Sequence, residues 1–593
     1  MSGNELLNET LAGALDLEYR TADLKNLADL ICFQVPTRKP ERIEAIVSTM
    51  FGDLKNIFGQ LPSIAQKAVS EAVHTWDGFY NSQMFESKYL ASPWSQTEGR
   101  TWSNSGLIYL FLIRGQIPKD LLEKLRDVAP LPQEDQINYH VAKGADDDDI
   151  SSENISHQDS FPKEYTVRYT SDAALINLDT ILHLVADDKI RVSAKTGCAS
   201  AATVTKIDGL LCGGDWYEEG ETDSMQAFAW PLLLQGGGLA KADGTLLKLT
   251  PAGRKALKNE LANGIKRAWE KWEKSKLFDE FSRVRDIKGQ KSSRGRTMTN
   301  PTRRRPMINA LLADLQPGKW IDVDELGRTM QTKSKYLFEM VNYNWKLYFC
   351  DQHYGYFDCD SSWMILQFRY LLVYLFEYCA TLGLVDVVYK DPFGSRSDLD
   401  PYWGTDEIPF LTHCDGLQYI RVNALGAFVF GHTSEFEVKK DTHKSYLYEG
   451  LDILFAGKGA ISPGEGLYLE KIAERTEVDR WRLSVSSLFA AIKQGESLVE
   501  IRQFFARSSD AELSPEIEQL FKDVEQRTTA FVEIGQTSLI ECSLEFRKQV
   551  LSHRKLSSLC LPAGEKHLVL LPGKEKKFAS ALEAIGFIVG LKK

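Results

Sequence analysis

One stretch of the chain, Thr170–Leu257, carries the strongest local folding signals in the sequence. Three runs of apolar residues recur there at helical spacing, and a serine that can cap a helix precedes the second run. Asp243-Gly244 then separates two short strands, as in a tight hairpin. This order predicts a compact unit of three helices closed by a hairpin. The expected helices are Ala173–Val185, Ser200–Leu211 and Ala227–Leu234, and the expected strands are Lys189–Val192, Leu239–Lys241 and Leu246–Thr250.

The pattern around the hairpin returns once, later in the chain. Gly238-Leu239 opens the first hairpin and Thr250 closes it, with Gly253 three residues on; Gly383-Leu384, Asn423 and Gly426 repeat that order. The second hairpin is longer because 390–415 is inserted at its tip. Three helices and a hairpin are typical of a winged helix, so the sequence predicts two in tandem.

A helix-turn-helix places its second helix in a major groove of DNA. If the helix Ser200–Leu211 has this role, its candidate DNA contacts are Thr203, Thr205 and Lys206. The same fold also serves in proteins that contact only other proteins.

The main concentration of charge that we identify lies between Phe281 and Pro306. Nine basic residues stand there against one acidic residue, and Gly, Ser, Thr and Pro fill the gaps. We interpret this segment as a flexible basic arm, because Lys and Arg that neutralise phosphates bind nucleic acid without reading sequence. A solvated interdomain linker is the alternative. The candidate contacts are Arg294, Arg296, Arg303, Arg304 and Arg305.

Thr21–Met50 reads as two helices around a basic turn, Pro36–Pro40. This resembles the SAP module, which touches DNA backbones, and the resemblance places Arg38 and Lys39 at the phosphate-facing turn. The chain lacks the Gly-Leu that the family carries before this turn, so a helical hairpin that does not contact DNA is the alternative interpretation.

Composition limits the remaining possibilities. A chain of 593 residues is expected to hold several domains, and its net charge of −11 argues against coating nucleic acid over the whole surface. Nine scattered cysteines form no CxxC pair, and no apolar run reaches the length of a membrane span. With an acidic N-terminus that lacks a signal-peptide layout, we expect a cytoplasmic protein with reduced thiols and no membrane association.

Catalytic and metal motifs are weak. There is no GxxxxGK[ST] phosphate loop. Glu437-Val438-Lys439 with Asp415 could form a metal-nuclease site. Cys350, His353 and Cys359, with His413 or Cys414 as a further ligand, could bind zinc without paired knuckles. Four aspartates at 146–149 are more typical of a solvated loop. We therefore expect no enzyme activity, no cofactor and no metal.

The C-terminal part carries a second resemblance. The runs RLSVSSLFAAIKQGESLVEIRQFF, SPEIEQLFKDV, FVEIGQTSLIEC, LVLLP and ALEAIGFIV are similar to the XPB-helicase N-terminal-like domain of bacterial proteins, and the stretch from Asp172 to Asp208 is similar to the region upstream of it. In helicases this domain precedes a DNA-translocating motor. The resemblance implies a role in engaging DNA, with the motor on another subunit.

Together these features predict an α+β fold, mostly helical. The expected domains are 1–100 (helical, SAP-like), 101–280 (first winged helix), 281–306 (basic linker), 307–445 (second winged helix) and 446–593 (small α/β, XPB-N-like). The expected function is a non-catalytic accessory subunit that binds duplex or single-stranded DNA beside a helicase, ATPase or nuclease partner, with antiphage defence and DNA repair as the two expected settings. A protein-interaction scaffold of a defence complex is the alternative, and a metal-dependent nuclease a further one.

Overall fold

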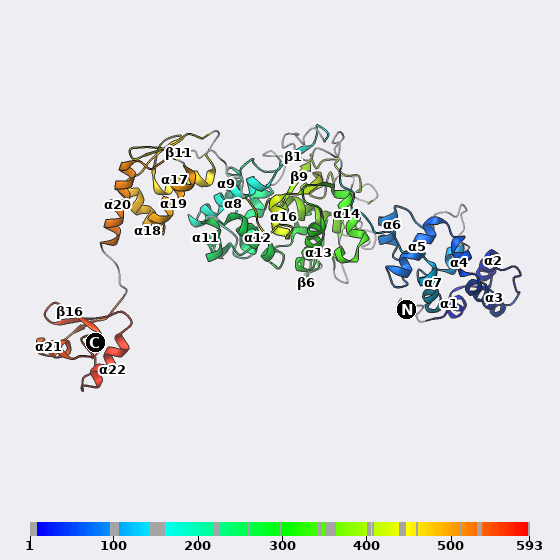
Figure 1. The fold of residues 1–593 in the computed structure, drawn as a ribbon, viewed down its shortest axis with the longest axis horizontal. Helices are drawn as coiled ribbons and strands as arrows, with labels where there is room; N and C mark the ends of the chain where they lie inside the picture. Colours follow the sequence, from blue (N-terminus) through cyan, green and yellow to red (C-terminus); the bar gives the residue numbers. More distant parts are fainter. Residues whose placement is uncertain are drawn as a thin grey trace. The chain divides into compact units, whose positions relative to one another are not determined.

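The computed structural model shows a mixed α+β protein, about 49% helical, with several small sheets (Figure 1). It divides into a first unit, 1–440 with 462–467, and a second unit, 441–461 with 468–593. The residues it describes are 9–94, 106–140, 161–217, 224–258, 260–292, 295–296, 298–341, 347–349, 363–399, 402, 405, 408–437, 446–457, 461–509, 511–530 and 536–590. Among these residues no helix is both long and apolar enough to cross a membrane.

The N-terminal helices of the first unit enclose their own apolar core. The predicted helices of Thr21–Met50 are present as α2 and α3, and Leu24, Leu27 and Ile46 are buried between them. This region joins the rest of the unit through Arg328, which pairs with Asp135 at 2.9 Å. Its helices are α1 (Leu11–Glu18), α2 (Thr21–Ile31), α3 (Lys39–Gly52), α4 (Leu54–Gly59), α5 (Ser63–His74), α6 (Ser82–Tyr89), the 3-10 helix η2 (Leu107–Leu110) and α7 (Lys119–Val128).

The helices and the hairpin predicted for Thr170–Leu257 are confirmed. Ser200 caps α9 by accepting a hydrogen bond from the Thr203 amide, and Asp243 pairs with Leu246 across the hairpin. The predicted first strand is reduced to isolated bridges, in which Arg191 pairs with Leu246. The elements are α8 (Ser171–Ala186), α9 (Ala201–Asp208), α10 (Gln226–Gly236), β2 (Ala240–Asp243), β3 (Leu246–Leu249), α11 (Pro251–Leu257) and α12 (Leu261–Trp272).

The later part of the unit repeats the order of helix, strand, two helices and hairpin. Its sheet has the strand order β1-β9-β10-β7, in which all neighbours are antiparallel. The elements are β1 (Thr166–Arg168), α13 (Pro301–Asp314), β7 (Trp320–Asp322), α14 (Val323–Thr332), η5 (Ser334–Tyr336), β8 (Tyr348–Phe349), α15 (Gln367–Val373), the π-helix η6 (Tyr374–Cys379), β9 (Val385–Tyr389), η7 (His413–Gly416), β10 (Leu417–Val422) and α16 (Ala424–Phe430).

The two positions that carry the sequence repeat have the same local geometry. Thr250 and Asn423 each cap the following helix, and each accepts a hydrogen bond from the amide of a glycine three residues on. At Gly253 and at Gly426, an added Cβ would lie closer than 3.0 Å to the carbonyl oxygen of Leu239 or Leu384. The hairpin is thus packed against the helix that follows it in the same way in both copies.

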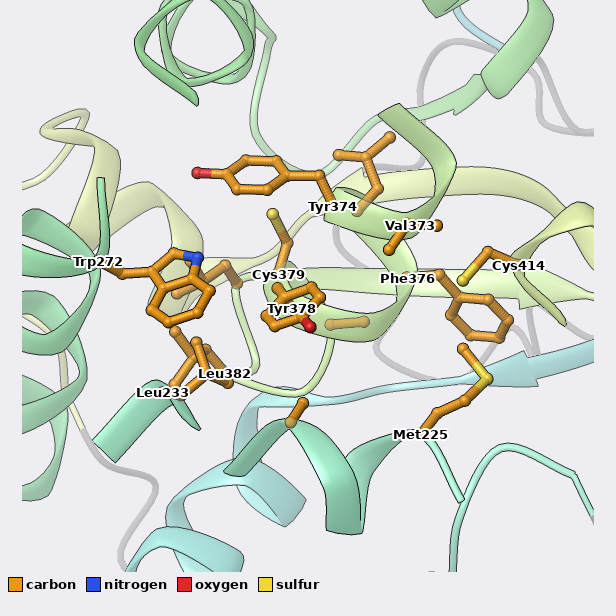
Figure 2. Packing of buried hydrophobic residues seen from close by; sticks show 14 of the residues in the cluster. Met225, Leu233, Trp272, Val373, Tyr374, Phe376, Tyr378, Cys379, Leu382 and Cys414 are labelled. Atoms are coloured by element: carbon orange, nitrogen blue, oxygen red, sulfur yellow. The ribbon is translucent and has the colours of Figure 1, made fainter. Parts of the chain in front are cut away.

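The third helices of the two repeats lie in one shared core. Eight of the eleven residues of α10 and every residue of η6 are buried, and the two helices pack together. Figure 2 shows this region: the rings of Trp272 and Tyr378 stack with centroids 5.3 Å apart, and Phe376 lies near Met225 and Cys414. The repeats therefore form one body rather than two separate modules.

The prediction that 281–306 is a flexible linker is wrong for most of this segment. It includes part of η4 (Glu280–Arg283), the short strands β4 (Ile287–Lys288), β5 (Lys291–Ser292) and β6 (Gly295–Arg296), and the first turns of α13. The predicted boundary at residue 307 falls inside α13. This segment is folded because several of its basic side chains have acidic partners in the core.

The second unit contains two apolar cores. The first is built on the sheet β11-β12-β14-β13 and the second on the sheet β15-β17-β16. The predicted closing strand Phe587–Val589 is absent there, and the predicted strand Phe531–Ile534 lies outside the described residues. The elements are β11 (Tyr446–Glu449), β12 (Asp452–Phe455), α17 (Pro463–Ile472), β13 (Glu474–Glu477), β14 (Arg480–Arg482), α18 (Val485–Lys493), α19 (Leu498–Ser508), α20 (Pro515–Thr529), β15 (Leu539–Glu541), α21 (Leu544–Ser552), β16 (Cys560–Ala563), β17 (His567–Leu570) and α22 (Glu575–Glu583).

Candidate nucleic-acid interface

Arg304 and Arg305 were expected to contact phosphates, and this expectation is wrong. Both side chains are 0% exposed. The guanidinium of Arg304 donates to both carboxylate oxygens of Asp279 at 2.9 and 2.8 Å. Arg305 Nε lies 2.6 Å from Glu280 Oε1, and its other nitrogens donate to backbone carbonyls. Neither side chain is available to a ligand in this conformation.

The Glu280 carboxylate is the centre of a buried polar cluster. Besides Arg305, it accepts hydrogen bonds from the Trp272 indole at 3.1 Å and from the Tyr370 hydroxyl at 3.0 Å. Burial lowers the pKa of Arg305, but the adjacent Glu280 outweighs this effect and leaves the guanidinium charged. The cluster therefore joins α12, η4, α13 and α15 through paired charges rather than through apolar contact alone.

Glu377, in the π-helix η6, gives the first unit a predicted pH dependence. Burial raises the pKa of its carboxyl to about 7, although Arg283, 2.8 Å away, lowers it. The folded chain holds this proton more tightly than the unfolded chain, so stability is expected to fall as pH rises from about 4.5 to about 7 and then level off. Burial also raises the pKa of Asp215 and of Asp415, in the same direction.

Urea unfolding on either side of this pH window measures the effect. The Glu377→Gln variant should show a shallower dependence, because one of the contributing protons is removed. A wild-type chain that becomes more stable as pH rises through this window would contradict the assignment.

The other arm residues divide into two groups. Arg303, on α13, is exposed and stays a candidate contact. Arg294 lies outside the described residues, and only the backbone of Arg296, in β6, is described.

Of the three candidate DNA contacts on the helix α9, one is contradicted by the structure. Thr203 is 4% exposed, and its hydroxyl accepts a hydrogen bond from the Arg191 amide at 3.1 Å, so it serves the fold and not a groove contact. Thr205 and Lys206 are exposed. Two exposed side chains provide few contacts for recognising a DNA sequence.

The basic turn near the N-terminus also differs in part from its predicted role. Arg38 is exposed and lies 3.7 Å from Glu41. Lys39 lies 2.8 Å from Asp16 and thereby ties the start of α3 to α1. Arg38 remains accessible to a phosphate, whereas Lys39 has a structural partner.

A stronger candidate surface lies in residues 241–276, which we name the basic segment. It carries ten Lys or Arg and four Asp or Glu, or +6. Six of the cations are exposed and have no ion pair within the described part of the chain. Two of them, Arg267 and Lys271, are four residues apart on α12 and so share one side of the helix, and Lys274 lies in the turn that follows it. The six are Lys241, Arg254, Arg267, Lys271, Lys274 and Lys276.

Sequence reasoning missed this segment because its charges are interleaved with buried residues. Ile265, Ala268, Trp269 and Trp272 face the core, so the helix reads first as an apolar stripe. A charge count restricted to the opposite side of that stripe would have found the surface.

The alternative metal and zinc sites gain no support. Asp415, proposed with Glu437 as a nuclease pair, is 1% exposed and pairs with Arg369 at 2.9 Å. The described residues contain no group of three or more His, Cys, Asp or Glu side chains that could hold a metal ion. Lys439, Cys350, His353, Cys359 and the aspartates at 146–149 lie outside those residues.

Comparisons with protein-family models and with curated proteins find no match for this chain. The resemblances to the SAP module and to the XPB N-terminal-like domain therefore stay predictions.

Proposed function

We propose that this chain is a non-catalytic accessory protein that binds duplex or partly opened DNA and presents it to a helicase, translocase or nuclease partner. The observation that carries the proposal is the basic segment, with six exposed cations that lack an ion pair among the described residues. On a protein of net charge −11 such a local surface is suited to the phosphate backbone.

The fold supports contact with phosphates rather than with bases. In both repeats the order of helix, strand, two helices and hairpin is that of a winged helix, which favours the tandem arrangement. The helix expected in the groove, α9, exposes only two of its three candidate contacts, Thr205 and Lys206, and the third helices of the repeats, α10 and η6, are buried against each other. Binding by exposed Lys and Arg alone is independent of sequence and strongly dependent on salt.

The test is a charge-reversal variant, Arg267→Glu/Lys271→Glu/Lys274→Glu, in a fluorescence assay with duplex DNA at several salt concentrations. We expect affinity to fall at least about tenfold and the slope of log K against log salt to decrease by about three. The matched control, Lys555→Glu/Lys576→Glu/Lys577→Glu, changes the same charge on exposed side chains of the second unit. Equal losses in both variants, or none in the first, would reject the interface.

A protein-interaction scaffold is the second candidate, and one observation favours it. Leu539, Val569 and Leu561 lie opposite one another across β15, β17 and β16, with Leu539 and Leu561 63% and 51% exposed. The side chains that alternate with them, such as Leu568 and Leu570, are buried in the core with α21 and α22, so one sheet face is open. DNA affinity weaker than about 10⁻⁴ M at physiological salt would favour this candidate.

A further inference from the structure

The second helices of the two repeats, α9 and α14, hold equivalent places in the fold. Ser200 caps α9 and Asp322 caps α14, and each helix packs one side on the next α-helix of its repeat. Counted from these caps, Lys206 on α9 takes the position that Arg328 has on α14. The outer sides of the two helices can therefore be compared residue by residue.

The outer side of α14 is covered within the first unit. Helix α6 packs along it, and Gln83 Nε2 donates to Gln331 Oε1 at 3.2 Å. Segment 130–140, which forms no helix or strand, also passes α14, where Arg328 Nη1 donates to the Asp135 carboxylate at 2.9 Å. The occupant of this side is thus a short helix beside an acidic, non-helical segment.

The same side of α9 is open to solvent. Ala202, Thr205 and Lys206 are exposed there, and Gly209, the C-cap in helical backbone geometry, takes the position of Gln331. A Cβ added at Gly209 would meet only the Thr205 carbonyl oxygen within 4 Å. Lys206 has no ion pair with any residue that the structure describes. A side that is covered in one repeat is therefore exposed in the other.

Charge and shape favour a protein segment on this side over DNA. Its one cation stands among small side chains, which let a helix approach closely but give phosphates little to bind. Arg191, exposed beside the start of α9, offers a second cation. The two cations match a segment with the chemistry of 130–140, which has two acidic residues and no Lys or Arg.

A second copy of this chain does not supply that segment, because its α6 and segment 130–140 cover its own α14. We infer that the outer side of α9 docks another protein, through a short helix beside an acidic, non-helical segment. Only the identity of that protein, as the helicase, translocase or nuclease partner, rests on the proposed function. Docking itself requires no DNA.

The probe for this side is a fluorescein-labelled peptide in which a Gly-Ser linker joins residues 82–90 to 130–140. The two pieces lie next to each other in the fold, since Lys88 donates a hydrogen bond to the Gln133 carbonyl. Fluorescence anisotropy with the full chain is expected to show binding, and Asp135→Lys in the peptide should weaken it about fivefold.

Two substitutions in the chain locate the bound peptide. Lys206→Glu reverses the charge and should weaken binding about fivefold, and Gly209→Arg should weaken it at least as much, because it adds bulk without removing positive charge. Arg254→Glu, the matched control, reverses an exposed charge on α11 and should leave binding unchanged. A peptide that displaced the chain's own segment from α14 would not respond to either substitution on α9.

The inference is overturned if the peptide does not bind, or if Lys206→Glu and Gly209→Arg bind it as the wild type does, with unfolding midpoints showing that both variants fold. It also fails if Lys206→Glu weakens duplex DNA and not the peptide, which makes α9 a DNA contact, or abolishes self-association, which makes a second copy the occupant. The variant with three reversed charges in the basic segment separates docking from the proposed function, because it should lose duplex affinity and keep the peptide.

Discussion

Replacing Arg305 with methionine is expected to lower the free energy of unfolding of the first unit by about 3–5 kcal/mol, because it leaves the Glu280 carboxylate buried without its counter-charge. Both side chains of this pair are 0% exposed, and Glu280 itself lies against Trp272 and Tyr370. Urea unfolding followed by tryptophan fluorescence measures the change. A flexible basic arm, in contrast, would tolerate this substitution with almost no effect.

The control for this prediction is the neighbouring residue on the same helix. Arg303→Met removes the same charge from an exposed position and should change stability by no more than about 0.5 kcal/mol. Arg305→Met/Glu280→Gln should recover part of the loss, since the amide still accepts hydrogen bonds but carries no charge. A loss below about 1 kcal/mol in Arg305→Met would show that the pair does not hold the core together.

The local fold of the two repeats was predictable because short-range signals carry it. Asp243-Gly244 sets the hairpin, Ser200 caps its helix, and the recurring Gly-Leu and Thr or Asn positions mark two copies of one unit. Each of these signals acts over a few residues, where propensity and hydrogen-bond geometry decide the outcome.

The sequence could not reveal which charged residues form buried ion pairs with residues elsewhere in the chain. Charge density along the chain predicts that Arg304 and Arg305 belong to a basic arm, whereas Asp279 and Glu280 meet them only when α13 docks. The helical positions of Arg304 and Arg305 do agree with their burial, because both lie on the same side of α13 as Ile308, Leu311 and Leu312. Helical phase was the better guide, and charge density was misleading.

The candidate interface was hidden in the sequence for a similar physical reason. Along the chain, the cations of the basic segment are separated by core residues such as Trp269 and Trp272, and Arg267 and Lys271 come to one side of α12 only when the helix forms. The burial of the third helices was likewise hidden, because an apolar helix in a winged-helix pattern is expected to have one free side, and α10 has almost none.

Gly253→Ala and Gly426→Ala are expected to destabilise the first unit by similar amounts, about 3 kcal/mol or slightly more for each substitution. In both copies the new methyl group would meet a backbone carbonyl oxygen, of Leu239 or Leu384, closer than 3.0 Å. That oxygen also accepts a hydrogen bond from the amide of the capping residue, Thr250 at 2.9 Å or Asn423 at 3.4 Å, so it cannot move without loss. Thermal and urea unfolding of the two variants measure the effect.

Gly52 and Gly59 provide the matched control, because each ends a helix of the same unit and an added Cβ there meets nothing within 4 Å. Alanine at these positions should leave stability unchanged or raise it by about 0.5–1 kcal/mol, through the lower entropy of the unfolded chain. If Gly253→Ala and Gly426→Ala differed from each other as much as from these controls, the two hairpin-to-helix joints would not be equivalent. The internal repeat would then hold for the sequence pattern but not for the packing that the pattern is expected to encode.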